Sequence, residues 1–407
     1  MGRHVKQDSA FFSWKWLLAA VLVLAVLGGS LFMFADTTVS GPAAPGSRSM
    51  EPGTGQPSEA EVDAQVEKLL ASMSTTEKVG QLVMVGVHGT DVNEDSLYML
   101  HQFHFGGIVL FDRNMESKEQ TRLLVQHLQE QSEEKLPLFV AVDEEGGLVV
   151  RGKSFLEPPP SQAEIGATGR PEEARRWAAW TAQELKAMGF NVNFAPVADV
   201  GSGRERSYSD DPSEVLSFVK EAGRGYTEQG LFYCLKHFPG IGRGVVDSHK
   251  DISSIEAGEA ELMESDLLPF HGMFEATGKG AGFDYFVMVG HLNYPAYNEE
   301  KPASLSREIM TGLLRDKLGY QGLIITDDLA MGAVIKQYPL RRAGAEAIKA
   351  GADIALICHE YENQEAVYMG ILEAVQDGSI SEERLDESVR RVLKAKLLHG
   401  LLPGKDG

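Results

Sequence analysis

The run LFVAVD, residues 138–143, shows the pattern that decides the fold: a short, continuous apolar segment that ends on an acid. An apolar run without polar alternation is typical of a strand that is covered on both faces, as in a parallel sheet. The acid stands where such a strand would end. Because the pattern recurs along the chain, the architecture can be inferred from its repetition.

Seven further apolar runs surround this one: QLVMVGV (81–87), GIVLF (107–111), VNFAPVAD (192–199), FYCLKHF (232–238), FVMVGH (286–291), GLIITDD (322–328) and IALIC (354–358). Amphipathic stretches with helical spacing separate them, for example residues 117–131 and 172–189. Eight strand-then-helix units predict an α/β protein with a single closed (β/α)8 barrel of the TIM type. The alternative is an open doubly wound sheet, but no G-x-G-x-x-G fingerprint follows the first strand.

The first 58 residues differ in composition from the rest. Residues 16–35 carry no charge and are about long enough to span a bilayer; a buried core helix is the alternative, but the segment has no polar face. We expect a positively charged cytoplasmic end at residues 1–15, a transmembrane anchor or signal segment at 16–35, a disordered Pro/Gly/Ser-rich linker at 36–58 and the folded domain at 59–407. The folded domain would then lie outside the cytoplasm, held at the membrane, or be secreted if the segment is cleaved.

The overall composition narrows the function classes. Hydrophobic residues make up 43% and charged residues 24%, which is typical of a globular protein with a full core. A formal charge of −21, without a basic patch, argues against nucleic acid as a partner. The two cysteines each lie in an apolar run and are expected to be buried free thiols. The eleven histidines show no metal-binding spacing, so we expect neither a metal nor another cofactor.

Ionisable residues gather at or just after the ends of the predicted strands. They are Asp143, Asp199, Lys236, His237, His291 and Asp327. A lone Asp in such a place is explained by capping of the next helix, but that does not explain the whole set. The carboxyl ends of barrel strands converge on one face, where catalytic residues of such barrels lie. We therefore expect a site on this face.

The segment KHFPGIGRGVVDSHKD, residues 236–251, crowds charged groups onto a glycine-rich loop. Lys236 and His237 are neighbours, and neighbours in a regular strand diverge, so both can face one ligand only if the backbone departs from strand geometry. Phe238–Pro239 is a candidate cis peptide bond. Its glycines would leave the loop free to move, as expected of a lid.

These motifs resemble glycoside hydrolase family 3, specifically its bacterial β-N-acetylglucosaminidases (β-hexosaminidases). The resemblance rests on KHFPG followed by DSH, VDEEGG, NVNFAPVADV, RSY, GGIVLFDRN and ITDDLAM, and it runs from about residue 75 to residue 400. It implies a retaining exo-enzyme that hydrolyses terminal β-linked N-acetylglucosamine from peptidoglycan or chitin-type fragments. The reaction would pass through a covalent glycosyl-enzyme intermediate without a cofactor.

The resemblance also implies roles for catalytic residues. Asp327 matches the family nucleophile, with the adjacent Asp328 as its rival. Asp247 and His249 match a loop-borne acid/base dyad, in which His249 exchanges the proton and Asp247 orients the ring. An arbitrary D-x-H is most often a solvated loop with a helix cap, and its position after KHFPG favours the catalytic interpretation.

Sugar-binding positions of the family are filled by Asp143, Arg151, Arg206, Lys236 and His237. Each could by itself be an ordinary ion pair, but together a carboxylate and several cations can hold sugar hydroxyls through charge-assisted hydrogen bonds. Asp199 and His291 are supporting candidates, with direct contact and a structural role both open.

Two positions depart from the family pattern. Ile241 replaces the usual histidine of KHFPGHG, and Leu148 the arginine of EGGRV. Neither residue is assigned to catalysis. We therefore expect the two differences to affect the packing of the loop or the aglycone side of the site. Two other functions remain: a family β-glucosidase or β-N-acetylglucosaminide phosphorylase, since a neutral imidazole repels anionic phosphate less than a carboxylate would, and a non-catalytic sugar-binding wall protein.

Overall fold

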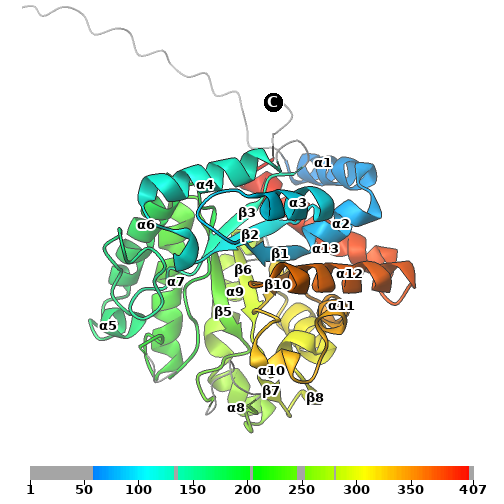
Figure 1. Ribbon diagram of the computed structural model, residues 1–407. Coiled ribbons are helices and arrows are strands. Elements are labelled where there is room, and N and C mark those ends of the chain that lie inside the picture. Colours follow the sequence, from blue (N-terminus) through cyan, green and yellow to red (C-terminus); the bar gives the residue numbers. More distant parts are fainter. Residues whose placement is uncertain (1–57, 133–135, 202–204, 245–252, 279–280, 403–407) are drawn as a thin grey trace, which may run out of the picture. The chain divides into compact units, whose positions relative to one another are not determined.

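The computed structural model describes residues 58–132, 136–201, 205–244, 253–278 and 281–402 (Figure 1). The expected cytoplasmic end and membrane segment, and all of the expected linker except Ser58, therefore lie outside the described residues. Among the helices that are described, none combines the length and the apolar character needed to cross a bilayer. The first described helix, α1 (Glu59–Ser72), begins where the folded domain is expected to begin.

Eight parallel strands form a nearly closed barrel in the described chain, in the order β10-β1-β2-β3-β4-β5-β6-β9. They are β1 (Val83–Gly86), β2 (Gly107–Leu110), β3 (Phe139–Val142), β4 (Val192–Asn193), β5 (Phe232–Phe238), β6 (Tyr285–Val289), β9 (Leu323–Thr326) and β10 (Ala355–Ile357). The ring is completed between β9 and β10, where the Thr326 N–H donates to the Ile354 carbonyl at 3.1 Å. All eight expected strands are present, and the expected barrel architecture is confirmed.

Strand β4 is shorter than expected. The sequence predicts a strand over residues 192–199, whereas regular pairing ends at Asn193. Pro196 has no N–H to donate to a neighbouring strand, so the ladder is interrupted there. Pairing resumes at Val197, which bridges to Lys236 of β5. The interruption leaves Asp199 on irregular backbone beside β5.

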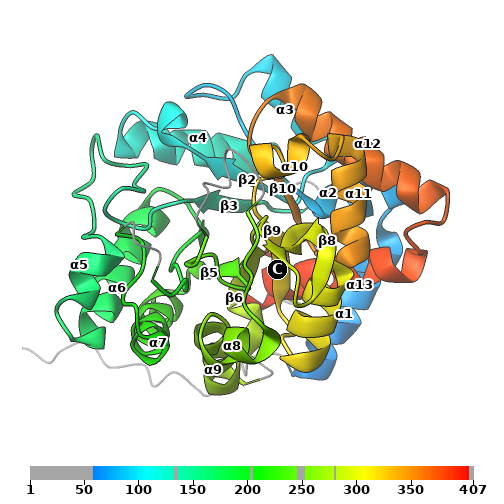
Figure 2. The same ribbon diagram turned by 90° about the horizontal axis from the view of Figure 1, so that it is seen from below.

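Helices cover the outside of the barrel (Figure 2). They are α2 (Thr75–Gln81), α3 (Glu94–Phe103), α4 (Lys118–Glu130), α5 (Gln162–Gly166), α6 (Pro171–Ala187), α7 (Pro212–Glu228), α8 (Glu259–Glu264), α9 (Leu268–Thr277), a π-helix (Glu308–Lys317), α10 (Gly332–Ile335), α11 (Leu340–Ala350), α12 (Tyr361–Gln376) and α13 (Glu382–Leu398), together with short 3₁₀ turns. The expected helices at 117–131 and 172–189 are α4 and α6. A small hairpin of β7 (Asn293–Tyr294) and β8 (Asn298–Pro302) was not expected, because its polar strands lack an alternating pattern.

The apolar runs are continuous because both faces of each strand are buried. In β3, Phe139 and Ala141 belong to the cluster that fills the barrel, whereas Val140 and Val142 pack in the layer between strands and helices. Cys234 and Cys358 belong to the inner cluster and are free and buried, as expected. The core thus fixes the strands, and their carboxyl ends carry the ionisable residues.

Candidate functional site

A buried lysine links two carboxylates at the ends of β3 and β5. Lys236 Nζ lies 2.8 Å from Asp143 Oδ1 and 2.6 Å from Glu145 Oε1. Arg151 approaches the other oxygen of Asp143 at 3.5 Å. Burial would lower the pKa of Lys236, but Asp143 and Glu145 more than offset it and raise the pKa above its usual value. The side chain therefore stays cationic inside the site.

Glu145 was not singled out from the sequence, yet it lies at the centre of the site. Its two oxygens accept hydrogen bonds from Nε and Nη2 of Arg206, both at 2.8 Å. Burial opposes its ionisation, but Lys236 and Arg206 outweigh burial and lower its pKa to about 2. The available signal was the composition of the predicted sugar-binding set, which holds the cations Arg151, Arg206 and Lys236 but a single carboxylate, Asp143. Charges that become buried require partners, so a further carboxylate was to be expected.

Asp199 anchors His237 and the root of the following loop. Its Oδ2 accepts from His237 Nδ1 at 2.8 Å, and its Oδ1 accepts the backbone N–H groups of His237 at 3.1 Å and Ile241 at 2.9 Å. The other ring nitrogen of His237 faces Arg206 Nη2 at 3.4 Å. From the sequence, Asp199 could either contact a ligand or have a structural role. In the structure its contacts support His237.

The backbone departs from strand geometry where Lys236 and His237 meet, as expected. The Lys236–His237 and Phe238–Pro239 peptide bonds are both cis, which confirms the expected cis bond before Pro239. The pairing register with β6 shifts between Lys236 and Phe238. Consequently Lys236 and His237, although adjacent, both reach the Glu145–Arg206 pair.

Asp327 and Asp328, just after β9, have different surroundings. Asp328 Oδ1 accepts backbone N–H groups of Ala330 at 3.0 Å and Cys358 at 3.2 Å, and burial raises its pKa. Burial would also raise the pKa of Asp327, but His291, His237, the N–H of Asp328 and Lys236 outweigh burial and lower it. Of the two neighbouring acids, Asp327 is therefore the one whose ionised form is favoured.

His291 supports the backbone behind Asp327. Its Nε2 lies 2.9 Å from the Asp328 carbonyl, and its Nδ1 lies 2.7 Å from the Ser304 hydroxyl. Burial lowers the pKa of His291, and the nearby Asp327 and Asp328 partly offset this effect. Because a carbonyl oxygen can only accept, Nε2–H is the donor to Asp328. The contacts give this histidine a supporting role for the segment that carries Asp327.

The acid/base dyad of Asp247 and His249 lies outside the described residues and stays a prediction. The root of their loop is described, and two of its glycines are required by close packing. A Cβ on Gly242 would lie 1.8 Å from the Val200 carbonyl oxygen, and Gly240 has a φ of 117°. Gly242 thus permits a close approach of two backbone segments, and Gly240 permits a left-handed backbone. The sequence by itself predicts only that the glycines let the loop move.

The positions that depart from the family pattern lie on two neighbouring loops. Leu148 occupies the turn closed by the Gly146–Val149 bridge, and its side chain is 71% exposed. Ile241 is partly buried and packs against the apolar layer. The two positions thus differ: Leu148 is open to solvent, whereas Ile241 contributes to packing.

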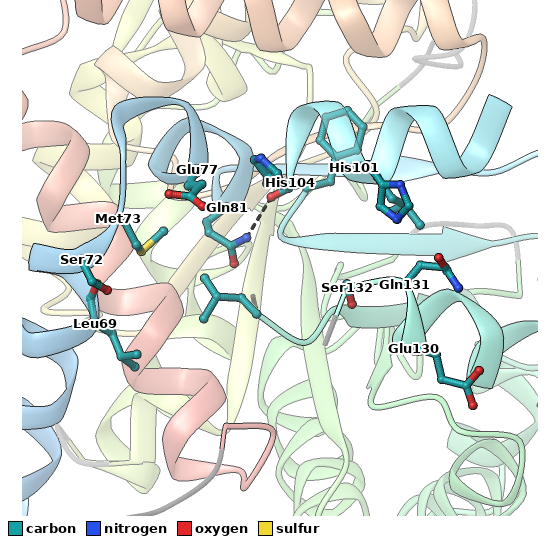
Figure 3. Close-up of a pocket in the computed structure, with 13 residues that line it drawn as sticks. Leu69, Ser72, Met73, Glu77, Gln81, His101, His104, Glu130, Gln131 and Ser132 are labelled. Carbon is teal, nitrogen blue, oxygen red and sulfur yellow. Dashed lines mark hydrogen bonds between the residues drawn. The ribbon is translucent and has the colours of Figure 1, made fainter. Parts of the chain in front are cut away.

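A cavity of about 770 Å³ lies at the opposite end of the barrel (Figure 3). Its wall includes Gln81, Phe105 and Leu136, which lie two or three residues before β1, β2 and β3. Gln81 Nε2 donates to the His104 carbonyl at 2.9 Å across this wall. None of the sequence-predicted site residues that the structure describes lines this cavity, and the described ones gather instead at the carboxyl ends of the strands.

Within the described ranges, no group of three or more His, Cys, Asp or Glu side chains is arranged to hold a metal ion. The described charges instead pair with one another. The arrangement can bind a neutral polyhydroxy ligand through both carboxylate acceptors and cationic donors, with an ionised carboxylate, Asp327, beside it.

Comparison with known proteins gives a consistent result. Residues 74–395 match the model of the glycosyl hydrolase family 3 N-terminal domain. Beta-hexosaminidase A of Pseudoalteromonas piscicida is 33% identical over 333 residues, which cover 73% of this chain and 54% of that protein. A beta-hexosaminidase of Xylella fastidiosa (strain M23) is 36% identical over 290 residues, covering 68% of this chain and 83% of the relative.

A solved structure supports the same relationship. The family 3 beta-N-acetylglucosaminidase from Paenibacillus sp. str. FPU-7 superposes with a TM-score of 0.78 at 36% identity, covering 82% of this chain and 64% of that one. The chain thus spans about half the length of the Pseudoalteromonas relative, but most of the Xylella one.

Proposed function

We propose that this chain, which belongs to glycosyl hydrolase family 3, is a glycoside hydrolase of the β-hexosaminidase type. In this proposal it is a retaining exo-enzyme that removes terminal β-linked N-acetylglucosamine from peptidoglycan or chitin-type fragments. The observation that carries the proposal is that Asp327 lies partly exposed directly after β9, at the same strand ends as Lys236 and His237, and that its pKa is lowered in spite of burial. The relatives that are named beta-hexosaminidase support the choice of sugar.

The chemistry follows from the roles of two groups. Asp327 attacks the anomeric carbon and forms the glycosyl-enzyme bond, while the bond to the leaving oxygen breaks. His249 gives that oxygen a proton, and Asp247 stabilises the ring. The now neutral His249 then takes a proton from water, which attacks the same carbon and releases Asp327. Two displacements at one carbon retain the β configuration.

The ion-paired residues bind the sugar before this step. Asp143 is 18% exposed and Arg206 26% exposed, so each offers part of its polar surface to a ligand. A carboxylate accepts from hydroxyl groups and a guanidinium donates to them, and such charge-assisted bonds are stronger than neutral ones. Binding and chemistry thus use different carboxylates.

An assay with the purified protein tests the proposal. We expect hydrolysis of aryl β-N-acetylglucosaminide well above that of aryl β-glucoside, with the β-anomer of the free sugar detected first by NMR. Preference for the glucoside would indicate a β-glucosidase. Formation of sugar 1-phosphate when phosphate is added would indicate a phosphorylase. Binding of the sugar without turnover would indicate a sugar-binding wall protein.

We further propose that residues 16–35 hold the enzyme at a membrane with the barrel outside the cytoplasm. The support is the uncharged segment and the positive charge before it. A reporter fused after Gly407 should be active only in a form that works outside the cytoplasm. Activity of a cytoplasmic reporter at that position would contradict the proposal.

A further inference from the structure

The charged side chains around the sugar site form one continuous chain of contacts with alternating sign. In order, its members are Arg151, Asp143, Lys236, Glu145 and Arg206, and Arg206 leads on to His237. The separations are 3.5, 2.8, 2.6 and 2.8 Å along the ion pairs, and 3.4 Å at the last step. Glu145 joins the ion pairs of Asp143 and Lys236, at the ends of β3 and β5, to Arg206, which comes from the loop after β4.

Glu145 is not placed to touch the sugar. Its side chain is 3% exposed, against 18% for Asp143 and 26% for Arg206. Its Oε1 serves both Lys236 and Arg206, and its Oε2 serves Arg206 Nε. Any effect of Glu145 on the substrate therefore passes through the two cations.

Arg206 depends on this one carboxylate. Within the described part of the chain, its side chain has hydrogen bonds to the two oxygens of Glu145 and the longer contact to His237. It lies on an irregular loop between β4 and α7, so no strand or helix fixes its direction. The bidentate contact with Glu145 thus sets where the guanidinium points.

We propose that Glu145 is a positioning residue of the sugar site: it holds Arg206 and Lys236 in one orientation and thereby sets the affinity for the terminal sugar. The inference rests on the proposed function, because it assigns Arg206 and Lys236 to sugar binding. A contact that is made equally in the ground state and the transition state appears in KM rather than in kcat. Glu145 should therefore act mainly on KM.

The protonation of Lys236 gives a second readout. The charged or titratable groups around it are Asp143, Glu145, Arg206, Cys234 and Asp327, which lie on or after four strands, β3, β4, β5 and β9. Burial opposes its charge, and Asp143 and Glu145 support it. Without the charge of Glu145, the pKa of Lys236 should fall. Lys236 would then lose its proton, and sugar binding would weaken, at a lower pH than in the unchanged protein.

The experiment compares Glu145→Gln with the unchanged full-length protein on an aryl β-N-acetylglucosaminide from pH 5 to pH 10. The amide keeps the volume but turns one acceptor into a donor that faces Arg206 and Lys236. We expect KM to rise by about 10- to 100-fold, as for the loss of a charge-assisted hydrogen bond, with kcat changed less than about threefold. The alkaline limb of kcat/KM should move to lower pH.

A matched control removes a buried carboxylate at the other end of the barrel. Asp353→Asn also breaks ion pairs with arginines, but it should leave KM and the pH profile unchanged. Should Glu145→Gln not fold, Glu145→Asp keeps the charge, and its shorter side chain cannot reach both cations; it should still raise KM severalfold. Unchanged KM in a folded Glu145 variant, or a loss confined to kcat, would overturn the inference.

The outcome also separates this inference from the proposed function. If the unchanged protein does not hydrolyse the substrate, the proposed function fails, and titration of both proteins with N-acetylglucosamine still tests Glu145. Weaker binding by Glu145→Gln supports the inference, and equal binding overturns it. If the unchanged protein is active and Glu145→Gln has the same KM, the inference alone fails.

Discussion

Both ends of the barrel bury charge, but they do so differently. At the amino ends of the strands, Lys396 Nζ donates to Gln81 Oε1 at 2.7 Å and to the Gly106 carbonyl at 3.0 Å. At the same end, just before β10, Asp353 accepts from the Ile324 N–H at 3.0 Å, Ser388 Oγ at 2.7 Å and two arginines. Both residues are fully buried, and the groups that satisfy them come from the protein itself.

At the carboxyl ends of the strands, charges pair with one another and remain partly open. Asp143, Arg206 and Asp327 keep some of their surface exposed, whereas Glu145 behind them is closed off. The closed charges at the amino ends act on the fold. An open charge at the carboxyl ends can also bind a ligand, and Glu145 acts on the ligand through its open partner Arg206. Substitutions at the carboxyl ends of the strands should therefore mainly lower activity, and those at the amino ends should mainly lower stability.

The largest effect is expected for the nucleophile. Asp327→Ala should lower kcat by roughly 10³-fold or more, since no covalent intermediate can form. Asp328→Asn is the matched control, because the amide oxygen can still accept the N–H groups of Ala330 and Cys358. A fluorinated glycoside should label Asp327 in mass spectrometry. A label on Asp328 would reverse the assignment.

The next effect concerns the predicted acid. His249→Ala should slow substrates with poor leaving groups by about 10²- to 10⁴-fold and should spare aryl glycosides whose phenolate leaves unaided. Asp247→Ala should follow the same pattern with a smaller loss, because the ring remains. The measurement is the slope of log kcat/KM against leaving-group pKa. Identical slopes in all three proteins would refute the acid/base role.

At the closed end, Asp353→Asn should reduce the free energy of unfolding by about 3–5 kcal/mol, because it leaves buried arginines without their partner. Burial opposes the ionisation of Asp353, but Arg315, Arg391 and Arg384 lower its pKa. Its contribution is thus present above the unfolded pKa of about 3.9 and lost as the pH falls through the lower folded value. Urea titrations at pH 7 and pH 3 measure both effects; a loss of kcat in the folded variant would contradict the division between the ends.

The smallest effect is expected for Lys396, whose pKa burial lowers to about 7. Between this value and the unfolded pKa of about 10.4, the unfolded chain binds more protons, so stability should rise with pH by at most about 1.4 kcal/mol per unit from this group. Lys396→Met should remove that part of the slope. Equal slopes for the two proteins in urea titrations from pH 7 to pH 10 would show that Lys396 does not titrate there.

Much of the fold could be predicted from the sequence because its signals are local. A run such as residues 138–143 needs two buried faces, and only a covered parallel sheet supplies them eight times over. The two-residue β4 and the β7–β8 hairpin were not predicted correctly. Pro196 interrupts the first, and the second has no hydrophobic period for a sequence pattern to reveal.

The sequence by itself determined where the barrel strands lie and which ionisable residues stand at their ends, since continuous apolar runs and the helical spacing between them are patterns of neighbouring residues along the chain. Only the tertiary structure decided which charges meet. Residues 143, 145, 206 and 236 come together because β3, β4 and β5 are adjacent in the barrel. Ion pairing and pKa depend on distances of a few ångströms and on burial, and both exist only in the folded chain.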